Sequence, residues 1–340
     1  MKKVSFVIEK LYQNNILFDK NQKKIFARDN AFAKYHVLYD VFKENSYDVA
    51  TCDINSIEES DIVIYNDLPN KLPSKKDIEK SYLIMNESPL VRADNFDKSK
   101  HKYFHKIFTW NDNLVDDKKY IKINYSFSFP KEINKDTKRK KLCCLIVSNK
   151  SSNYKNELYS ERIQLIEWFE SHHLEDFSLY GIGWDSFRFQ GVKAVRALNK
   201  LPFVKEIFYK LFKRKYKSYR GTVDSKFDTM KKYKFAIAYE NVKDENGYIT
   251  EKIFDVFIAG CVPIYLGAKN INEYIPSDCF IDRRKFDSNS EMYSYIKSMN
   301  DVKYLEYLNN IERYLNSKQS KQFTIETFAE TIVKNILEKN

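Results

Sequence analysis

The sequence predicts an α/β fold of two domains, each built on a parallel sheet. Short apolar runs rich in β-branched and aromatic residues alternate with segments whose apolar residues recur at helical spacing. Two such halves are separated by the charged stretch KEINKDTKRKK at residues 131–141, which is typical of an interdomain linker. The 340 residues are enough for two domains of ordinary size. We therefore expect domains at residues 1–135 and 136–340.

The first half shows the alternation from its first residues onward. Residues Ala31–Glu44 carry apolar side chains at helical spacing, so a helix is expected there. Runs that suit buried strands lie at Val4–Ile8, Val49–Cys52, Ile62–Tyr65, Tyr82–Met85, Ile107–Trp110 and Tyr120–Ile123.

The second half begins with LCCLIVSN at Leu142–Asn149, which predicts a strand buried on both faces. Further strands are expected at Phe177–Tyr180, Phe235–Tyr239, Val262–Leu266 and Phe280–Asp282. Helices are expected at Ser160–His172, Glu251–Ala259, Ser290–Met299, Tyr304–Leu315 and Ile325–Leu337. Because ligands bind beyond the carboxyl ends of strands in such sheets, the two halves suit an enzyme with a cleft.

The charge balance allows several partners and does not choose among them. The formal net charge is +11, from 58 basic and 47 acidic side chains, so nucleic acid, phosphorylated ligands and anionic membranes are all available. Aromatic residues interleaved with Lys and Arg would suit a protein that binds single-stranded nucleic acid. No recognition-helix or RRM-like signature is present, however, and the basic residues are spread out. Nucleic acid is therefore the less favoured partner.

Cysteine usage and hydropathy predict a cytoplasmic location. The five cysteines are odd in number, lie in apolar runs and lack a C-x-x-C spacing, which indicates reduced thiols. The apolar run near the N-terminus is too short for a signal peptide. No uncharged apolar run approaches the about 20 residues of a membrane-spanning helix.

The stretch YENVKDENGYITEK, at residues 239–252, places polar and charged residues directly before a helix. Thr250 is a natural N-cap whose hydroxyl would accept a backbone N–H, which puts Glu251 and Lys252 in the first turn. A cation is unfavourable there unless an anion offsets it, and a diphosphate would do so. Asn241 and Tyr248 could hydrogen-bond the same ligand. The alternative is a solvated loop before a capped helix with Lys252 in water, and the spacing alone favours that alternative.

This stretch closely resembles the sugar-nucleotide-binding motif of the bacterial type of α1,3/4-fucosyltransferases, glycosyltransferase family 10. The resemblance spans roughly residues 81–286, and an acidic insert at residues 242–246 departs from it. The matching segments are Glu240–Asn241, Gly247–Lys252, Val262–Gly267, Tyr274–Phe286, Ile146–Phe169, the NESP of Asn86–Pro89, and Phe108–Asn113.

The resemblance implies the GT-B architecture, in which two Rossmann-like domains face a cleft. The N-terminal domain would bind the acceptor and the C-terminal domain GDP-fucose. The implied activity is an inverting transfer of fucose from GDP-fucose to a glycan containing GlcNAc or glucose, with α1,3 or α1,4 linkage. An inverting GT-B glycosyltransferase that uses another nucleotide sugar is the alternative.

The resemblance also assigns roles to residues. Glu87 is the expected general base, because inversion needs a base on the acceptor side; its alternative role is a surface carboxylate beside a helix that starts at Ser88 and Pro89. Arg162 and Lys252 would stabilise the GDP leaving group. Arg162 could instead be an exposed residue paired with a nearby Glu, and Arg188 is the other candidate for this phosphate clamp. The expected donor-binding residues are Arg162, Asn241, Tyr248, Thr250, Glu251 and Lys252, with Ser148, Asn149 and Glu240 as further candidates.

The sequence contains no D-x-D triplet and no zinc-like spacing of its histidines. Basic side chains are the expected substitute for a metal, so no cofactor and no essential divalent metal are predicted.

The segment LPFVKEIFYKLFKRKYKSYR, at residues 201–220, predicts a basic amphipathic helix. Such a helix can lie on a membrane surface, here the inner face of the membrane. The alternative is a helix that packs its apolar face on the core and leaves its lysines in solvent. A peripheral membrane contact would suit an acceptor glycan that is lipid-linked or part of lipopolysaccharide. Protein glycosylation is also among the expected processes.

Overall fold

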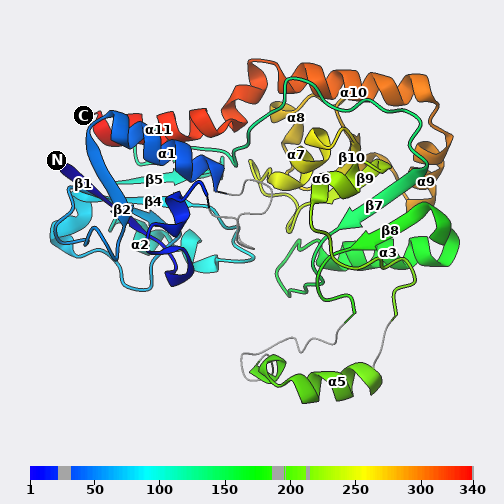
Figure 1. Ribbon diagram of the computed structural model, residues 1–340, viewed down its shortest axis with the longest axis horizontal. Coiled ribbons are helices and arrows are strands. Elements are labelled where there is room, and N and C mark those ends of the chain that lie inside the picture. The colour runs from blue at the N-terminus through cyan, green and yellow to red at the C-terminus, as the bar shows by residue number, and fades with distance from the viewer. Residues whose placement is uncertain (22–31, 186–194, 196, 212–214, 339–340) are drawn as a thin grey trace.

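The computed structural model describes residues 1–21, 32–185, 195, 197–211 and 215–338, which form two α/β units (Figure 1). Arg188 and residues 212–214 of the basic segment lie outside the described residues.

The first unit is a six-stranded parallel sheet with the strand order β2-β1-β3-β4-β5-β6. Val4 in β1 pairs with Val49 on one side and Ile62 on the other. Polar and apolar residues do not alternate along these strands because the sheet is covered on both faces. The elements are β1 (Lys2–Val7), α1 (Ala33–Glu44), β2 (Tyr47–Thr51), β3 (Ile62–Asn66), β4 (Ser81–Met85), α2 (Lys98–His101), β5 (Lys106–Thr109) and β6 (Tyr120–Lys122).

The second unit is a five-stranded parallel sheet with the order β11-β10-β9-β7-β8. Its strands are β7 (Lys141–Ile146), β8 (Phe177–Tyr180), β9 (Tyr233–Tyr239), β10 (Val262–Leu266) and β11 (Ile281–Asp282). Its helices are α3 (Tyr159–His172), α5 (Pro202–Leu211), α6 (Lys226–Met230), α7 (Glu251–Ile258), α8 (Ile271–Tyr274), α9 (Asn289–Ser298) and α10 (Asp301–Leu315). The strands and helices expected from the alternation in the two halves are thus confirmed, with ends that differ by at most three residues. The helix predicted over residues 201–220 is shorter, since α5 covers only Pro202–Leu211 and residues 215–220 are not helical.

The last helix, α11 (Ile325–Leu337), lies beside α1 on the first sheet (Figure 1). Phe328 and Ile332 of α11 are buried in the same cluster as Leu38 and Phe42 of α1. The division of the chain at residues 135 and 136 stays a prediction, and the packing adds that the C-terminal helix shares the core of the first sheet.

The charged stretch at residues 131–141 is docked on the second unit. Arg139 is buried, and its Nη1 donates to the main-chain oxygens of Tyr233 at 3.0 Å and Gly260 at 2.6 Å. Gly260 has φ +69°, and a Cβ there would lie 2.1 Å from the carbonyl oxygen of Asn134. Only glycine therefore lets α7 end against this stretch.

Helix α5 projects away from the rest of the second unit (Figure 1). Phe203 is 73% exposed, and Leu201 and Ile207 are 50% and 40% exposed. These side chains therefore do not pack on the core. Within the described ranges, no helix combines the length and the apolar character that crossing a membrane requires.

Candidate active site

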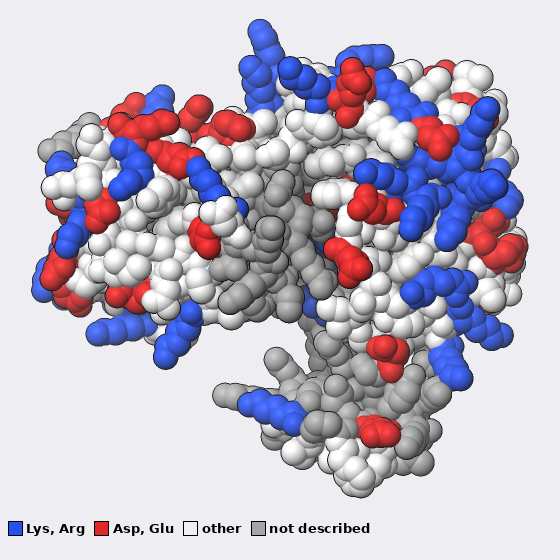
Figure 2. All heavy atoms as spheres, viewed as in Figure 1, with Lys and Arg blue, Asp and Glu red and all other residues white. Residues whose placement is uncertain are grey.

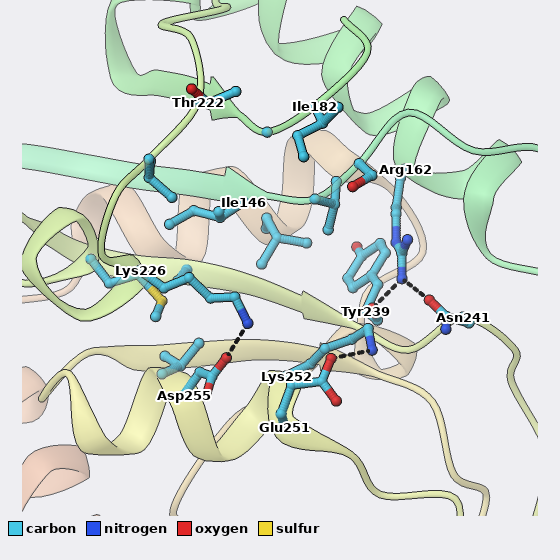
Figure 3. Close-up of a pocket in the computed structure, with 18 of the residues that line it drawn as sticks. Ile146, Arg162, Ile182, Thr222, Lys226, Tyr239, Asn241, Glu251, Lys252 and Asp255 are labelled. Atoms are coloured by element: carbon cyan, nitrogen blue, oxygen red, sulfur yellow. Dashed lines mark hydrogen bonds and ion pairs between the residues drawn. The ribbon is translucent and has the colours of Figure 1, made fainter. Parts of the chain in front are cut away.

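A cavity of about 320 Å³ lies at the carboxyl ends of the central strands of the second sheet, beside the start of α7 (Figure 3). Strands β7 and β9 are neighbours although β8 lies between them in the chain. The cavity is therefore at the point where the strand order reverses, which is the usual position of ligands in open α/β sheets. Its polar lining includes Ser148, Lys150, Arg162, Thr222, Asp224, Lys226, Tyr239, Asn241, Glu251, Lys252 and Asp255.

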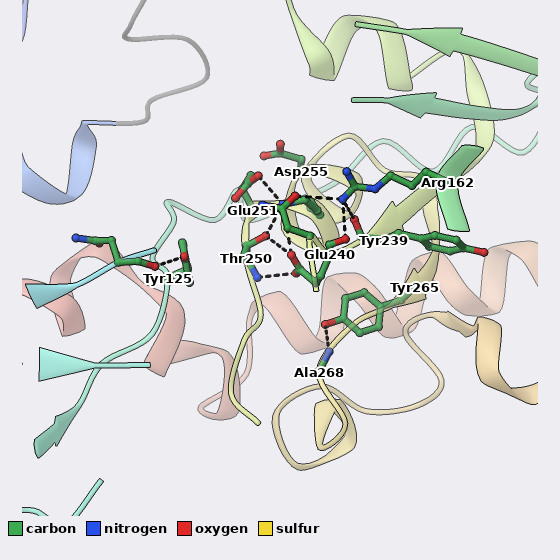
Figure 4. Close-up of polar contacts among 12 residues, drawn as sticks. Tyr125, Arg162, Tyr239, Glu240, Thr250, Glu251, Asp255, Tyr265 and Ala268 are labelled. Carbon is green, nitrogen blue, oxygen red and sulfur yellow. Dashed lines mark hydrogen bonds and ion pairs between the residues drawn. The ribbon is translucent and has the colours of Figure 1, made fainter. Parts of the chain in front are cut away.

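Glu240, directly after β9, is fully buried and organises the start of α7 (Figure 4). Its carboxylate accepts hydrogen bonds from the backbone N–H of Thr250 at 2.8 Å and from the hydroxyl of Thr250 at 2.6 Å. Thr250 does occupy the N-cap position, but its side chain makes no cap hydrogen bond. This corrects the predicted cap: the buried carboxylate is a stronger acceptor, so the hydroxyl donates to it.

Lys252 is held between two carboxylates. Its Nζ lies 3.0 Å from Glu251 and 3.4 Å from Glu240. Burial alone would lower the pKa of Lys252, but Glu251 and Glu240 outweigh it and raise that pKa above its usual value. The anion that offsets this cation at the helix start is therefore part of the protein, which corrects the expectation that a diphosphate is needed for it.

Glu251 stays ionised at the cavity wall. Burial would raise its pKa, but Lys252 and Lys226 outweigh burial and lower the pKa of Glu251 to about 2. An ionised carboxylate here can accept hydrogen bonds from hydroxyl groups of a ligand.

Arg162, on α3, is 3% exposed and fixes the loop that follows β9. Its Nη2 donates to the main-chain oxygens of Tyr239 and Glu240 at 2.6 Å each, and to Oδ1 of Asn241 at 3.2 Å. Burial lowers its pKa. Arg162 is therefore not the exposed, Glu-paired residue of the alternative interpretation.

Several charged lining residues were not predicted from the sequence, among them Lys150, Lys226 and Asp255. Lys226 of α6 and Asp255 of α7 form an ion pair at 2.8 Å on the wall of the cavity. Lys150 follows β7, and no carboxylate of the described residues lies within ion-pair distance of it or of Arg162. Lys150 and Arg162 are thus cations whose charge an anionic ligand can meet. Lys150 could have been found from the sequence, because it directly follows a predicted strand and lies two residues beyond Ser148.

The cavity brings together five of the predicted donor-binding residues: Ser148, Arg162, Asn241, Glu251 and Lys252. Asn149 is not among the lining residues, and its side chain donates to the carbonyl of Gly183 at 3.0 Å. Glu240 and Thr250 are not lining residues either, but both contact Nζ of Lys252. Tyr248 is 1% exposed and packs on Trp110 of the first unit, so it lies outside this cavity.

Glu87 lies in the first unit, two residues after β4. Its backbone N–H donates to Oδ1 of Asp67 at 3.2 Å. Burial raises the pKa of Glu87, the carboxylates of Asp67 and Glu251 raise it further, and Lys150 and Lys252 oppose them. Charged side chains that line the cavity of the second unit therefore act on Glu87 of the first unit.

The helix expected to start at Ser88 and Pro89 does not form. The backbone N–H groups of Val91 and Arg92 both donate to the carbonyl of Ser88, which makes a turn, and a short 3₁₀ helix begins only at Ala93. The side chain of Asn95 accepts from the backbone N–H of Leu68 and donates to the carboxylate of Asp67, and both residues follow β3. These bonds hold the segment after Pro89 against the end of β3, so a helix does not continue from Pro89.

Comparison with known proteins identifies the class. A family model described as glycosyltransferase family 10 (fucosyltransferase), C-terminal, matches residues 136–332, which is more than half of the chain. An α-(1,4)-fucosyltransferase of Arabidopsis thaliana is 44% identical over 80 residues, 23% of this chain and 20% of that protein. The matched stretch thus spans about a fifth of that relative's length.

Two solved structures share the whole fold. The structure of an α1,3-fucosyltransferase with GDP has a TM-score of 0.56 at 15% identity and covers 100% of this chain and 91% of its own. HepE of Anabaena in complex with UDP and glucose has a TM-score of 0.55 at 8% identity, with 99% of both chains covered. The fold is therefore that of the GT-B glycosyltransferases, as predicted.

With its fold and its family model in agreement, the chain belongs to glycosyltransferase family 10, the fucosyltransferases.

Proposed function

We propose that this protein is an inverting fucosyltransferase that moves fucose from GDP-fucose to a hydroxyl group of GlcNAc or glucose in a glycan, with α1,3 or α1,4 linkage. One observation carries the proposal. A cavity lined by lysines and an arginine lies at the start of α7, and its charges act on the carboxylate of Glu87 in the other unit, whose pKa is raised by burial. Membership of family 10 supports fucose as the sugar.

The cavity supplies what a nucleoside diphosphate leaving group needs. Negative charge grows on the diphosphate as the glycosidic bond to it breaks, and fixed cations stabilise that charge. Lys252 and Arg162 take this role, and Lys150 adds a third positive group at the same edge. Lys252 is held by Glu240, and Arg162 by the carbonyls of Tyr239 and Glu240 at the end of β9, so little reorganisation of these two groups accompanies the reaction.

Glu87 is proposed as the general base that takes the proton from the attacking hydroxyl. A base works best when its pKa approaches the working pH, and burial moves the pKa of Glu87 upward. The remaining donor-side residues, Ser148, Asn241 and Glu251, would hydrogen-bond the nucleotide sugar. We expect no cofactor and no requirement for a divalent metal, because the basic side chains supply the positive charge.

Another nucleotide sugar is the second candidate donor, since the fold is shared almost as fully with the UDP-bound HepE structure. Nucleic acid is not a proposed partner. On the face drawn in Figure 2, both signs are mixed on the first unit, and the Lys and Arg side chains that gather on the second unit have acidic side chains beside and among them.

We also propose that α5 makes a peripheral contact with an anionic membrane on the cytoplasmic side. Three apolar side chains of this region are exposed, and Lys200, Lys215, Lys217 and Arg220 nearby are exposed as well. This contact would bring the active site to a lipid-linked or lipopolysaccharide acceptor.

Thermal unfolding with GDP, GDP-fucose, GDP-mannose, UDP and CMP, each with and without EDTA, tests the donor. A ligand at 100 times its Kd adds about 2.7 kcal/mol of stability. We expect stabilisation by GDP and GDP-fucose, none by UDP or CMP, and no effect of EDTA. Transfer to glycans ending in GlcNAc or glucose follows, with Glu87→Ala as an inactive control that still binds GDP. Stabilisation by UDP or CMP alone would exclude GDP-fucose as the donor and would leave the glycosyltransferase class unchanged.

A further inference from the structure

Asn86, the residue before Glu87, has its polar groups bonded on all sides. Its backbone N–H donates to Asp67 at 2.8 Å, and its side chain contacts Asn66 at 2.7 Å and Lys34 at 2.9 Å. Its carbonyl oxygen accepts from Nε1 of Trp110 at 3.1 Å and also from the hydroxyl of Tyr125. The peptide that carries Glu87 is therefore fixed in orientation.

The two residues that hold this carbonyl also touch the donor-side loop. The ring of Tyr248 lies 4.8 Å from that of Trp110, centroid to centroid, and 6.0 Å edge-to-face from that of Tyr125. Tyr248 stands two residues before Thr250 and four before Lys252. A shift at the start of α7 would thus reach Asn86 through these rings. Figure 4 shows Tyr125 across from the Glu240–Thr250 contacts.

We propose that Tyr125 and Trp110 are positioning residues that hold Glu87 through the carbonyl of Asn86 and couple it to the loop before α7. This rests on the proposed function, because Glu87 is its general base. A base must lie within hydrogen-bond reach of the proton that it abstracts, so a small rotation of this peptide is costly for the rate.

The electrostatic setting of Glu87 defines what a rotation would change. Charged groups face it from every element around it: Lys34 of α1, Asp67 after β3, Lys150 after β7, and Glu251 and Lys252 of α7. Moving the carboxylate relative to these groups changes its proton affinity. A positioning role should therefore alter both the rate and the pH dependence.

Tyr125→Phe tests the proposal, because it removes the hydroxyl and keeps the ring on Tyr248. We expect kcat to fall about fivefold to tenfold, with the KM for GDP-fucose and the stabilisation by GDP unchanged. Tyr304→Phe is the matched control, since the Tyr304 hydroxyl also donates to a main-chain carbonyl, that of Lys234 at 2.9 Å in the second unit. In a Glu87→Gln background, Tyr125→Phe should lower the residual rate no further.

A second measurement does not depend on activity. In protein with carbon-13 in its Glu carboxyl groups, the Glu87 signal is the one missing from Glu87→Gln, and its titration midpoint gives the proton affinity. We expect the midpoint to move in Tyr125→Phe and to stay in Tyr304→Phe. An unchanged midpoint, an unchanged kcat, or an equal loss of rate in the Glu87→Gln background would each overturn the positioning role. If the midpoint moves but the protein transfers no fucose, the proposed function is wrong and the positioning role of Tyr125 still stands.

Discussion

Lys34 is a half-buried cation beside the proposed base. Its Nζ donates to Oδ1 of Asn86 at 2.9 Å and lies over the rings of Tyr35 and Phe328 at 5.0 and 5.1 Å. Burial outweighs the attraction of Asp67, Glu87 and Glu251, and it lowers the pKa of Lys34 to about 8. Lys34 is therefore mostly charged at neutral pH and loses its proton near pH 8.

This position predicts how Lys34→Met changes the pH profile. With Glu87 as the proposed base, transfer requires its ionised form, so we expect the rate to fall as the pH drops through the pKa of Glu87, which already lies above its usual value. Removing a neighbouring cation disfavours the ionised form and raises that pKa further. We expect the acidic limb of the kcat profile to move to higher pH, measured with saturating GDP-fucose.

Lys43→Met, on the same helix, is the control. Lys43 lies 3.9 Å from Asp48 in an exposed pair, so its loss should leave the profile in place. If the acidic limb of the kcat profile does not move in Lys34→Met, or moves equally in both variants, Lys34 does not act on Glu87.

At the scale of elements, α5 carries a prediction of its own. The protein should bind vesicles of phosphatidylcholine with phosphatidylglycerol, and bind phosphatidylcholine alone less, because the exposed lysines favour an anionic surface. Phe203→Glu replaces an aromatic side chain of this helix that is 73% exposed. Losing that apolar contact should weaken vesicle binding about tenfold in a flotation assay.

Val302→Glu serves as the control, since Val302 is 70% exposed on α10, away from α5. Binding that resists high salt, or that falls equally in both variants, would contradict a specific contact through α5. The fucosyl transfer to a soluble acceptor should be the same in all three proteins.

The elements themselves were largely predictable from the sequence, and the reason is their burial. Strands such as β3 and β4 are covered on both faces, so their apolar runs indicate their position directly. The packing of α11 was not predictable, because an amphipathic helix at the chain end does not specify which of two sheets it covers. Its buried face meets α1, which lies far away in the sequence.

The site was predictable where short segments of the sequence carry it. Lys252 and Asn241, from residues 239–252, line the cavity because a strand end and a helix start are local features, and Arg162 of α3 lines it from a second segment. The partner of the Thr250 hydroxyl is ten residues upstream and changes its role from cap to donor. Lys226 and Asp255 come from two helices whose contact no local pattern encodes.

A polar cluster around Asp112, which follows β5, joins the two units. Its carboxylate accepts from Lys122 of the first unit, and from the hydroxyl of Tyr274 at 2.6 Å and the side chain of Asn270 at 2.8 Å in the second. Asn270 also accepts from the N–H of Gly247, where a Cβ would lie 2.3 Å from the carbonyl of Trp110. Gly247 thus permits close contact between the units.

Because the proposed base and the cavity proposed for the donor lie on different units, Asp112→Ala should affect transfer more than donor binding. Burial opposes ionisation of Asp112, but Lys122, Tyr274 and Asn270 outweigh it and lower its pKa. Its stabilising contribution is therefore present at pH 7 and is lost only as the pH falls through that lowered pKa. At pH 7 we expect a loss of about 1 to 2 kcal/mol in unfolding free energy.

Asp176→Ala separates stability from alignment. Asp176 also accepts from a tyrosine hydroxyl, Tyr293 at 2.7 Å, and from a lysine, Lys297 at 2.6 Å, but all three lie within the second unit. Both variants should lose similar stability in denaturant unfolding and keep their affinity for GDP. Only Asp112→Ala should then lose kcat, by about tenfold, since only it loosens the alignment of Glu87 with the donor. Equal kcat in the two variants would mean that the Asp112 cluster stabilises the protein without setting the geometry between its units.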